Sequence, residues 1–251
     1  MDNTNRKNSD RTILVTGASS GIGAAVAELL LSEGYRVVAT SRDGGALGGL
    51  YGGDSNAVCV PWDLSDIGRI KEYAAEVNRA AGAVSGLVHC AGAQDVMPLH
   101  LTKPELLERV FGLNSFAAIL LAAAFARKGM YAESASFVLV SSLSAHEGAR
   151  GRSVYAASKA ALEGFTVAVS PELSDKGIRV NCVAPGIVET QSVKGFLSQL
   201  SAEQKESLLG GYPLGIGKPN DVAGLIEFLV SDKSRWISGN VFTPDGGHLA
   251  R

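Results

Sequence analysis

The residues with the most definite chemical potential are Tyr155 and Lys159, in the segment YAASK. Their i, i+4 spacing places a phenol and an amine on one face of a helix. A neighbouring ammonium group favours the phenolate form of tyrosine, so the pair could donate or accept a proton as one unit. Such pairs also arise in ordinary helices, where the ring packs on the core and the amine stays in water. The other motifs of the chain distinguish between these two interpretations.

A glycine-rich segment, TGASSGIG, joins the first apolar run of the chain to a helical pattern. Gly17, Gly21 and Gly23 allow a tight turn and let a pyrophosphate approach the backbone N–H groups at a helix N-terminus. Their spacing, GxxxGxG, differs from the GxGxxG of the general dinucleotide fingerprint. A turn that serves only packing is the alternative. The position of the segment, between the first strand and the first helix, favours a nucleotide site.

Short β-branched runs alternate with longer helical patterns along the chain, which is typical of an α/β fold. The runs GLVHCAG, FVLVSS and IRVNCV are apolar enough to be buried on both faces. We therefore predict a doubly wound parallel sheet of seven strands, with helices on both faces and ligands at the carboxyl ends of the strands. The expected strands occupy residues 11–16, 35–40, 57–62, 86–92, 137–142, 178–183 and 240–244.

Three stretches carry local predictions of their own. The glycine-rich stretch from Gly44 to Gly53 predicts a mobile loop. Pro171 lies within the helical pattern that contains Tyr155, and it predicts a kink or an end of that helix near residues 167–171. The pattern at 115–126 is apolar nearly all round, which indicates a helix buried on two sides.

Length and composition indicate one large domain, because 251 residues with 46% hydrophobic content can bury a sizeable core. We expect residues 11–251 to form this single domain and residues 1–10 to be a flexible tail. The 23 Lys and Arg nearly balance the 25 Asp and Glu, so no overall field indicates a nucleic acid or a membrane surface as partner. A small molecule is the expected partner.

The three cysteines, Cys59, Cys90 and Cys182, are too scattered for a disulfide framework or a metal motif. We interpret them as reduced thiols of a cytoplasmic protein without a metal. The polar N-terminus lacks the apolar segment of a signal peptide, and no apolar run reaches membrane-spanning length. Both features agree with a cytoplasmic location.

The second expected strand ends in Ser41 and Arg42. A site for NAD usually has a carboxylate here to bind the ribose 2′-hydroxyl, whereas a 2′-phosphate favours a cation. The sequence therefore predicts NADP(H) as the preferred cofactor, with NAD(H) possible because Asp43 follows directly. A solvated surface charge is the alternative for Arg42. After the third strand, Asp63 could bind adenine or cap a helix from Ser65 onward.

In this order, the motifs resemble those of the short-chain dehydrogenase/reductase family from about residue 11 to residue 247. Ser142 stands thirteen residues before Tyr155 at the end of a strand, like the family's catalytic serine, and Asn114 falls at the position of its catalytic asparagine. The segment PDGG at 244–247 resembles the family's C-terminal signature. The resemblance implies a single-domain Rossmann fold with the catalytic residues Asn114, Ser142, Tyr155 and Lys159.

The resemblance also implies a set of cofactor-binding residues, which includes the nicotinamide contact in NCVAPGIVET. These residues are Gly17, Ser19, Ser20, Gly21, Ile22, Gly23, Ser41, Arg42, Asp63, Leu64, Ala91, Gly92, Tyr155, Lys159, Pro185, Gly186, Ile187 and Thr190. One departure stands out, because the chain has His89 and Cys90 where the family usually has two asparagines before Ala-Gly. We expect different hydrogen bonding there, with His89 bonded to the backbone rather than catalytic.

The activity that the resemblance implies is NADP(H)-dependent interconversion of a ketone and a secondary alcohol. Tyr155 would donate a proton to the substrate carbonyl oxygen, and Ser142 would hydrogen-bond that oxygen. Lys159 would support Tyr155 and bind the nicotinamide ribose, and Asn114 would position a water that links the lysine to solvent. A non-catalytic, cofactor-binding scaffold is a remote alternative, because none of these residues is missing.

The substrate is less defined than the reaction. Overall similarity favours a 3-oxoacyl-[acyl-carrier-protein] reductase, and a dehydrogenase of a sugar, a sterol or a small cyclic alcohol is the alternative. Residues 188–212 would form a lid over the substrate. The loop after Ser142 offers four polar side chains near the pocket mouth: His146, Glu147, Arg150 and Arg152. The two arginines could meet an anionic substrate or form a solvated rim.

Two kinds of protein partner follow from the resemblance. An acyl carrier protein is acidic and would need a basic patch beside the site, for which Arg127, Lys128 and Lys176 are candidates. A homotetramer or homodimer would pack through the helices that contain Asn114 and Tyr155.

Overall fold

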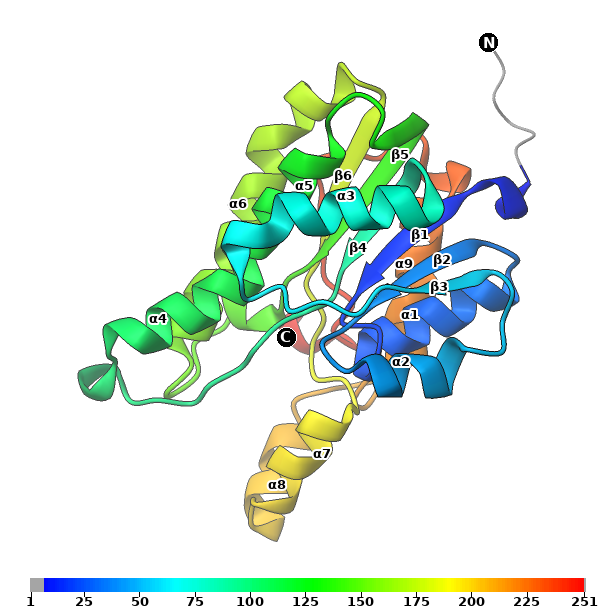
Figure 1. The fold of residues 1–251 in the computed structure, drawn as a ribbon. Coiled ribbons are helices and arrows are strands. Elements are labelled where there is room, and N and C mark those ends of the chain that lie inside the picture. Colours follow the sequence, from blue (N-terminus) through cyan, green and yellow to red (C-terminus); the bar gives the residue numbers. More distant parts are fainter. Residues whose placement is uncertain (1–6, 251) are drawn as a thin grey trace.

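A parallel sheet of seven strands forms the centre of the computed structural model, which describes residues 7–250 (Figure 1). The strand order is β3-β2-β1-β4-β5-β6-β7, and each neighbouring pair is parallel. This arrangement confirms the predicted α/β fold. The strands are β1 (Thr12–Thr16), β2 (Arg36–Thr40), β3 (Ala57–Cys59), β4 (Val84–His89), β5 (Tyr131–Val140), β6 (Ile178–Val183) and β7 (Val241–Phe242).

Helices cover both faces of the sheet (Figure 1). Alternate side chains of a strand point to opposite faces, so Ile13 and Val15 of β1 pack with one helical layer and Leu14 packs with the other. The first layer contains α1 (Gly21–Ser32), α2 (Gly44–Tyr51) and α9 (Pro219–Val230), and the second contains α3 (Ile70–Ala81), α5 (Ala117–Phe125) and α6 (Ser153–Ser174).

Strands β1 and β4 lie side by side, with Thr16 opposite His89. The chain continues from β1 toward one edge of the sheet and from β4 toward the other. Folds of this kind bind ligands in the crevice at the carboxyl ends of such a pair. At the same edge, α4 (Pro104–Phe111) lies to one side, and α7 (Gln191–Ser198) and α8 (Ala202–Leu209) project away from the sheet (Figure 1).

The glycine-rich stretch 44–53 is not the mobile loop that the sequence predicts, because it contains helix α2. The Asp43 carboxylate caps this helix by accepting a backbone N–H of its first turn at 2.9 Å. Leu47 and Tyr51, one turn apart, are buried, and the Tyr51 hydroxyl donates to the carbonyl of Ala18 at 2.7 Å. Two buried side chains and a cap outweigh the low helix propensity of glycine.

Helix α6 continues through Pro171 to Ser174, so the predicted end near residues 167–171 is wrong, whereas the alternative of a kink there stays a prediction. Proline removes the hydrogen bond to the carbonyl four residues earlier, that of Val167. Val167 is 57% exposed, so water can bind that carbonyl. Leu173 is buried beyond the proline and anchors the last turn.

The helices α4 and α5 are joined by a π-helical turn, Gly112–Phe116, into one segment of 22 residues. This segment has the length and composition of a membrane-spanning helix, so the prediction that no apolar run is that long is wrong. Half of its apolar window is buried, and Leu121 and Phe125 pack in the core with Tyr73 of α3. It is a core helix of the α/β fold.

Several boundaries differ from those expected. Strand β3 ends at Cys59 rather than at residue 62, β4 spans Val84–His89 rather than 86–92, β5 spans Tyr131–Val140 rather than 137–142, and β7 spans Val241–Phe242 rather than 240–244. Helix α3 begins at Ile70 rather than at Ser65. Within the expected tail, Asn8–Asp10 form a 3₁₀ turn, and the Asn8 side chain donates to the carbonyl of Glu33 at 2.8 Å. Residues 1–6 of that tail lie outside the described residues.

Candidate active site

The loop between β1 and α1 leaves no room for side chains at its glycines. Gly17 and Gly21 have φ values of 68° and 56°, in the left-handed region that glycine adopts without strain. A Cβ built at Gly23 would lie 2.2 Å from the carbonyl oxygen of Gly17. The first turn of α1 contains no acidic residue, so its free N–H groups can face an anion. The loop therefore fits the pyrophosphate of a nucleotide cofactor.

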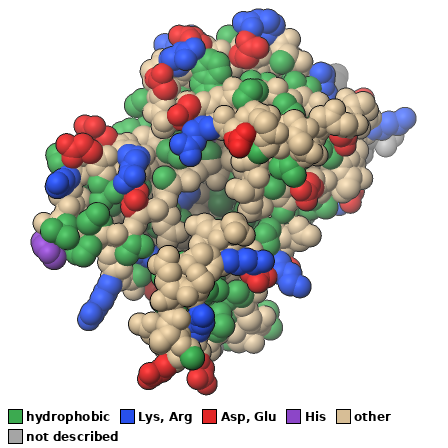
Figure 2. Space-filling model, turned by 60° about the horizontal axis from the view of Figure 1, so that its bottom comes forward, with side chains coloured by type: hydrophobic (Ala, Val, Ile, Leu, Met, Phe, Trp, Pro, Cys, Tyr) green, Lys and Arg blue, Asp and Glu red, His purple; other side chains and the backbone are tan. Residues whose placement is uncertain are grey.

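A cavity of about 400 Å³ opens over this loop at the carboxyl edge of the sheet. Figure 2 views the molecule with this edge turned forward and shows a hollow near the centre of the face. Trp62, Cys90 and Leu113 also line the cavity, although they are not among the predicted cofactor-binding residues. The predicted cofactor residues that it brings together are Gly17, Ser19, Ser20, Gly21, Ile22, Gly23, Ser41, Arg42, Asp63, Leu64, Ala91, Gly92 and Thr190.

A second cavity, of about 530 Å³, adjoins the first and shares Ile22, Thr190 and Ser192 with it. Gln94 and His248 line it as well, and neither was expected there. His248 directly follows the PDGG motif, so that motif was the available signal. The predicted residues in its wall are Ser142, Tyr155, Pro185, Gly186, Ile187 and Thr190. The expected cofactor and substrate residues thus surround two connected spaces, except Lys159, which is not among the residues lining either cavity.

Tyr155 and Lys159 lie one turn apart near the start of α6. The Lys159 side chain is buried, with 4% of the residue exposed, and its Nζ lies 5.9 Å from the centroid of the Tyr155 ring. The same Nζ donates a hydrogen bond to the carbonyl of Val140 at 2.7 Å. The amine is therefore held between the end of β5 and the phenol, unlike the solvated lysine of an ordinary surface helix.

Ser142 follows the end of β5 and lines the second cavity with Tyr155. Its Oγ accepts a hydrogen bond from the backbone N–H of Ser144 at 3.2 Å. A hydroxyl has one hydrogen to donate in addition to its acceptor sites. The Ser142 hydroxyl hydrogen is thus available to an oxygen atom in the cavity.

Asn114 is fully buried in the π-helical turn. Its side chain accepts from the N–H of Ala93 at 2.7 Å and donates to the carbonyl of the same residue at 3.0 Å. It also donates to Ser158 Oγ at 2.9 Å. A Cβ built at Gly92 would lie 3.1 Å from Asn114 Oδ1 and 3.4 Å from Lys159 Nζ. The π turn therefore brings Asn114 beside Lys159, at the segment that follows β4.

His89 is also fully buried, and its ring connects three elements. Nε2 lies 3.3 Å from the carbonyl of Leu113 in the π turn, and Nδ1 lies 3.0 Å from Thr16 Oγ1 at the end of β1. Burial, and then the charge of Lys159, lower the pKa of His89 to about 3. The neutral ring therefore donates from Nε2 to Leu113 and accepts from Thr16 at Nδ1. This agrees with the prediction that His89 is bonded to the backbone.

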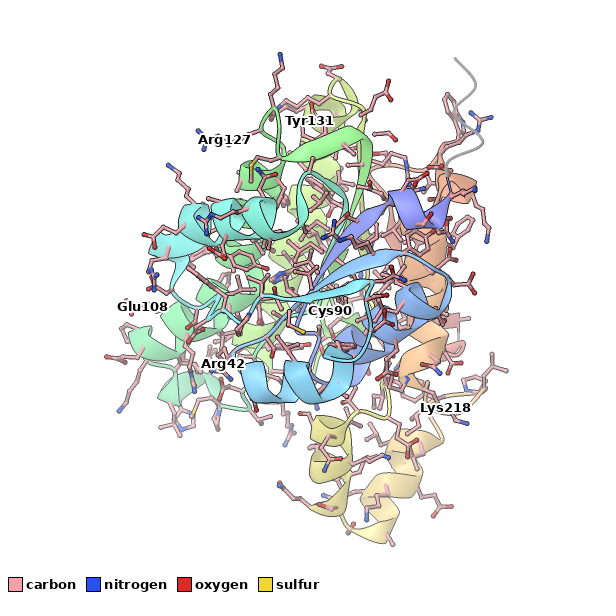
Figure 3. All side chains as sticks on the ribbon, turned by 45° about the vertical axis from the view of Figure 1, so that its right-hand side comes forward. Arg42, Cys90, Glu108, Arg127, Tyr131 and Lys218 are labelled. Atoms are coloured by element: carbon pink, nitrogen blue, oxygen red, sulfur yellow. The ribbon has the colours of Figure 1, made fainter. Side chains whose placement is uncertain are left out.

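The end of β2 forms the far wall of the first cavity. Arg42 lies there beside the start of α2, and Cys90 lies nearer the centre of the sheet (Figure 3). The carboxylate of Asp63 accepts hydrogen bonds from the hydroxyl and the N–H of Ser65, which lower its pKa, and Arg42 lowers it further. Asp43 is occupied by its cap on α2. Arg42 is the basic residue among those lining this cavity.

Two groups of residues do not reach the site as expected. Arg127, Lys128 and Lys176 precede β5 and β6 at the amino edge of the sheet, and Figure 3 shows Arg127 there, away from the cavities. The predicted basic patch beside the site is therefore wrong for these residues. His146 turns to Glu163, with 3.0 Å between Nε2 and Oε2, and does not line either cavity.

Comparison with known proteins assigns the chain to a family. Residues 17–248 match the family described as "Enoyl-(Acyl carrier protein) reductase". The chain is 32% identical over 237 residues to the 3-oxoacyl-[acyl-carrier-protein] reductase FabG of Vibrio harveyi, across 93% of this chain and 95% of that protein. It is 32% identical over 238 residues to the reductase MabA of Mycobacterium tuberculosis, across 94% and 92%. The chain belongs to the short-chain dehydrogenase/reductase family, and is an NAD(P)-dependent oxidoreductase acting on CH–OH groups.

Solved structures share this fold over almost the whole chain. A putative short-chain alcohol dehydrogenase from Sinorhizobium meliloti matches with a TM-score of 0.89 and 31% identity, covering 96% of both chains. A putative NAD(P)-dependent gluconate 5-dehydrogenase from Beutenbergia cavernae, with bound NADP, matches with a TM-score of 0.88 and 32% identity, covering 96% of this chain and 97% of that one. Relatives with this fold therefore have names that point to different substrates.

The buried His89 makes stability depend on pH. Its pKa is about 3 in the folded chain, below about 6.5 in the unfolded chain, so the unfolded state binds the extra proton as pH falls between these values. Through this group, the free energy of unfolding should fall by about 2 kcal/mol between about pH 7 and about pH 5. Urea unfolding at both pH values measures it. His89→Asn lacks the titrating group and should show a smaller fall, and equal falls in both proteins would contradict the prediction.

Proposed function

We propose that the protein is an NADP(H)-dependent ketoreductase, similar to 3-oxoacyl-[acyl-carrier-protein] reductases, that interconverts a ketone and a secondary alcohol. The observation that carries this proposal is the position of Ser142 and Tyr155 in one cavity wall, with the buried Lys159 amine behind the phenol. The adjoining cavity has the glycine loop that a dinucleotide needs. A bound nicotinamide cofactor supplies the hydride in the reductive direction and accepts it in the other.

Tyr155 donates a proton to the carbonyl oxygen as that oxygen gains negative charge. The Ser142 hydroxyl donates a hydrogen bond to the same oxygen, because its own oxygen already accepts from Ser144. Lys159 stabilises the phenolate that remains, and its burial keeps this attraction from being screened by water. The same amine would bind the ribose of the cofactor, as the family resemblance implies.

Asn114 would hold this arrangement in place. Its amide binds Ala93 and Ser158, and the Ser158 hydroxyl donates to the carbonyl of Tyr155 at 2.7 Å. The water that Asn114 is expected to position between Lys159 and solvent stays a prediction.

Arg42 supports the choice of NADP(H). It lines the cofactor cavity beside Ser41, and the neighbouring carboxylate of Asp43 is engaged by the N-terminus of α2. A guanidinium group can bind a 2′-phosphate with two hydrogen bonds. Use of NAD(H) remains a secondary activity in this proposal.

The alternative function is a sugar, sterol or small cyclic alcohol dehydrogenase, and the similarity to a putative gluconate 5-dehydrogenase favours a sugar acid within that class. In either case residues 188–212 would act as the lid, because Val193 and Phe196 of α7 and Leu208 of α8 line the second cavity. A scaffold without turnover is the remote alternative. Turnover of any ketone with NADPH would exclude it.

We also propose a cytoplasmic homotetramer or homodimer that packs through α5 and α6. Exposed apolar side chains lie on these helices and at the end of the π turn before α5, with Phe116 45%, Leu120 38% and Val167 57% exposed. Burying them against a second copy would remove apolar surface from water. Sedimentation equilibrium at micromolar concentration should give a multiple of the 26.0 kDa chain mass, and Val167→Lys with Leu120→Lys should reduce it. A wild-type mass of one chain would overturn the proposal.

The general-acid role of Tyr155 predicts the effect of Tyr155→Phe. The variant should keep its fold and its NADPH affinity, measured by circular dichroism and cofactor fluorescence, because only one oxygen is lost. Ketone turnover should fall by about 10²–10⁴-fold. Tyr131→Phe, at the amino end of β5 away from the site (Figure 3), is the matched control and should keep wild-type turnover. A loss of less than about tenfold in Tyr155→Phe would contradict the assignment.

The role of Arg42 predicts a change in cofactor selectivity. Arg42→Ala should raise the KM for NADPH by about tenfold or more, because a charge-assisted hydrogen bond to phosphate is lost. The KM for NADH, which lacks the phosphate, should change far less. Steady-state kinetics with both cofactors measures this, and Arg127→Ala, at the opposite edge of the sheet, serves as the control. Equal effects on both KM values would refute the 2′-phosphate contact.

A further inference from the structure

The wall of the second cavity carries more positive than negative charge. It contains Arg150 and Arg152, and Glu147 is the acidic residue among those lining it. The Glu147 carboxylate faces the ring of His248, with 3.2 Å between Oε2 and Nε2. The other ring nitrogen of His248 lies 2.8 Å from the carbonyl of Gly211. The single carboxylate is therefore directed to the histidine and not to the arginines.

Arg152 is held in place by packing rather than by an ion pair. Its guanidinium carbon lies 5.3 Å from the centroid of the Phe196 ring on α7. This contact joins the loop after Ser142 to the helix across the cavity, and fixes the guanidinium in the cavity wall. Among residues 7–250, neither Arg152 nor Arg150 has a carboxylate within ion-pairing distance. Both cations are thus available to a ligand.

The expected cofactor does not account for these two cations. Its phosphates fit the first cavity, at the glycine loop and Arg42, which Arg150 and Arg152 do not line. The remaining space of the second cavity belongs to the substrate, because it also contains Ser142 and Tyr155. Apolar walls beside a charged group raise the local potential and favour a ligand of opposite charge.

We propose that the substrate carries an anionic group, a carboxylate or a phosphate, which Arg152 and Arg150 bind while Tyr155 and Ser142 hold the reacting oxygen. This inference rests on the ketoreductase function proposed above. A guanidinium fork matches both kinds of anion by two parallel hydrogen bonds. The group sits on the part of the substrate that is remote from the carbonyl, so it selects and orients the substrate without taking part in hydride transfer.

Two sources could supply this anion. One is the carboxylate of a small oxo acid, and the other is the phosphate of a phosphopantetheine arm that carries an acyl thioester. Two matched substrate pairs separate them. The first pair is a small oxo acid whose single carboxylate is remote from the ketone and the methyl ester of that acid, which is neutral. The second pair is a 3-oxoacyl thioester of phosphopantetheine and the same thioester of pantetheine, which lacks the phosphate.

In low-salt buffer with NADPH, kcat/KM for the anionic member should exceed that for the neutral member by about tenfold or more in at least one pair. This difference in kcat/KM should come from a lower KM for the anionic member rather than from a higher kcat. It should shrink as salt is added. The pair that shows it identifies the source of the anion. Equal kcat/KM values within both pairs would overturn the proposal.

Three variants test whether the arginines cause the preference. Arg152→Met keeps an apolar stem against Phe196 but removes the charge, so together with Arg150→Gln it should lower kcat/KM for the anionic member to that for the neutral member of the same pair. Arg152→Lys keeps a charge and should retain part of the excess. Arg127→Gln is the control at the opposite edge of the sheet and should behave as wild type. An excess that survives in the double variant would refute the assignment to these residues.

The result also separates this inference from the proposed function. Turnover of the neutral substrates without any preference for the anion would leave the ketoreductase function intact and refute the inference. Absence of turnover with all four compounds would refute the proposed function similar to 3-oxoacyl-[acyl-carrier-protein] reductases. Calorimetric binding of the same four compounds to the NADP⁺-loaded protein then measures the anion preference directly, and equal affinities within both pairs would refute it as well.

Discussion

Residues 90–93, the segment that follows β4, lie between the glycine loop of the cofactor cavity and the residues that would handle the proton. Both sites require this segment in one position, so hydrogen bonds from neighbouring elements must hold it. The N–H of Ala91 donates to Thr16 Oγ1 at 3.2 Å, and Thr16 in turn meets the buried ring of His89. Both backbone groups of Ala93 are bound by the amide of Asn114. Buried backbone groups without such partners would cost free energy, so these bonds determine the path of the chain.

Both cavities depend on that path. On one side, a Cβ built at Gly17 would lie 2.9 Å from the nitrogen of Ala91, so the glycine loop packs directly on this segment. On the other side, Gly92 lies against Asn114 and Lys159. A shift of the segment would therefore move the cofactor loop and the proton-handling residues together. The chain uses His89 for this purpose where relatives in the family usually have asparagine, and the imidazole spans from β1 to the π turn.

Reaction and specificity reside in different parts of the molecule. The residues that would handle the proton lie on the end of β5 and on α6, two elements fixed by the core. The groups that would recognise the substrate lie on the loop after Ser142 and on α7 and α8, which project from the sheet (Figure 1). This division explains how relatives with one fold can have names that point to a 3-oxoacyl-[acyl-carrier-protein] or to gluconate.

The sequence by itself determined the parallel sheet, the glycine loop and the order of Asn114, Ser142, Tyr155 and Lys159, because these depend on short-range patterns: β-branched runs, glycines in a tight turn and a spacing of one helical turn. Tertiary structure decided the rest. Burial of Leu47 and Tyr51 turned a glycine-rich stretch into a helix. The buried Leu173 kept α6 intact beyond Pro171.

Tertiary structure also determined three further features, for one physical reason. They are the partners of His89, the π turn at Asn114 and the edge of the sheet on which Arg127 lies. Each depends on which residues meet across the sheet, and residues that are distant in sequence supply those contacts: Thr16 lies 73 positions from His89. Local propensity contains no information about such pairs, whereas burial and hydrogen bonding in the folded chain determine them.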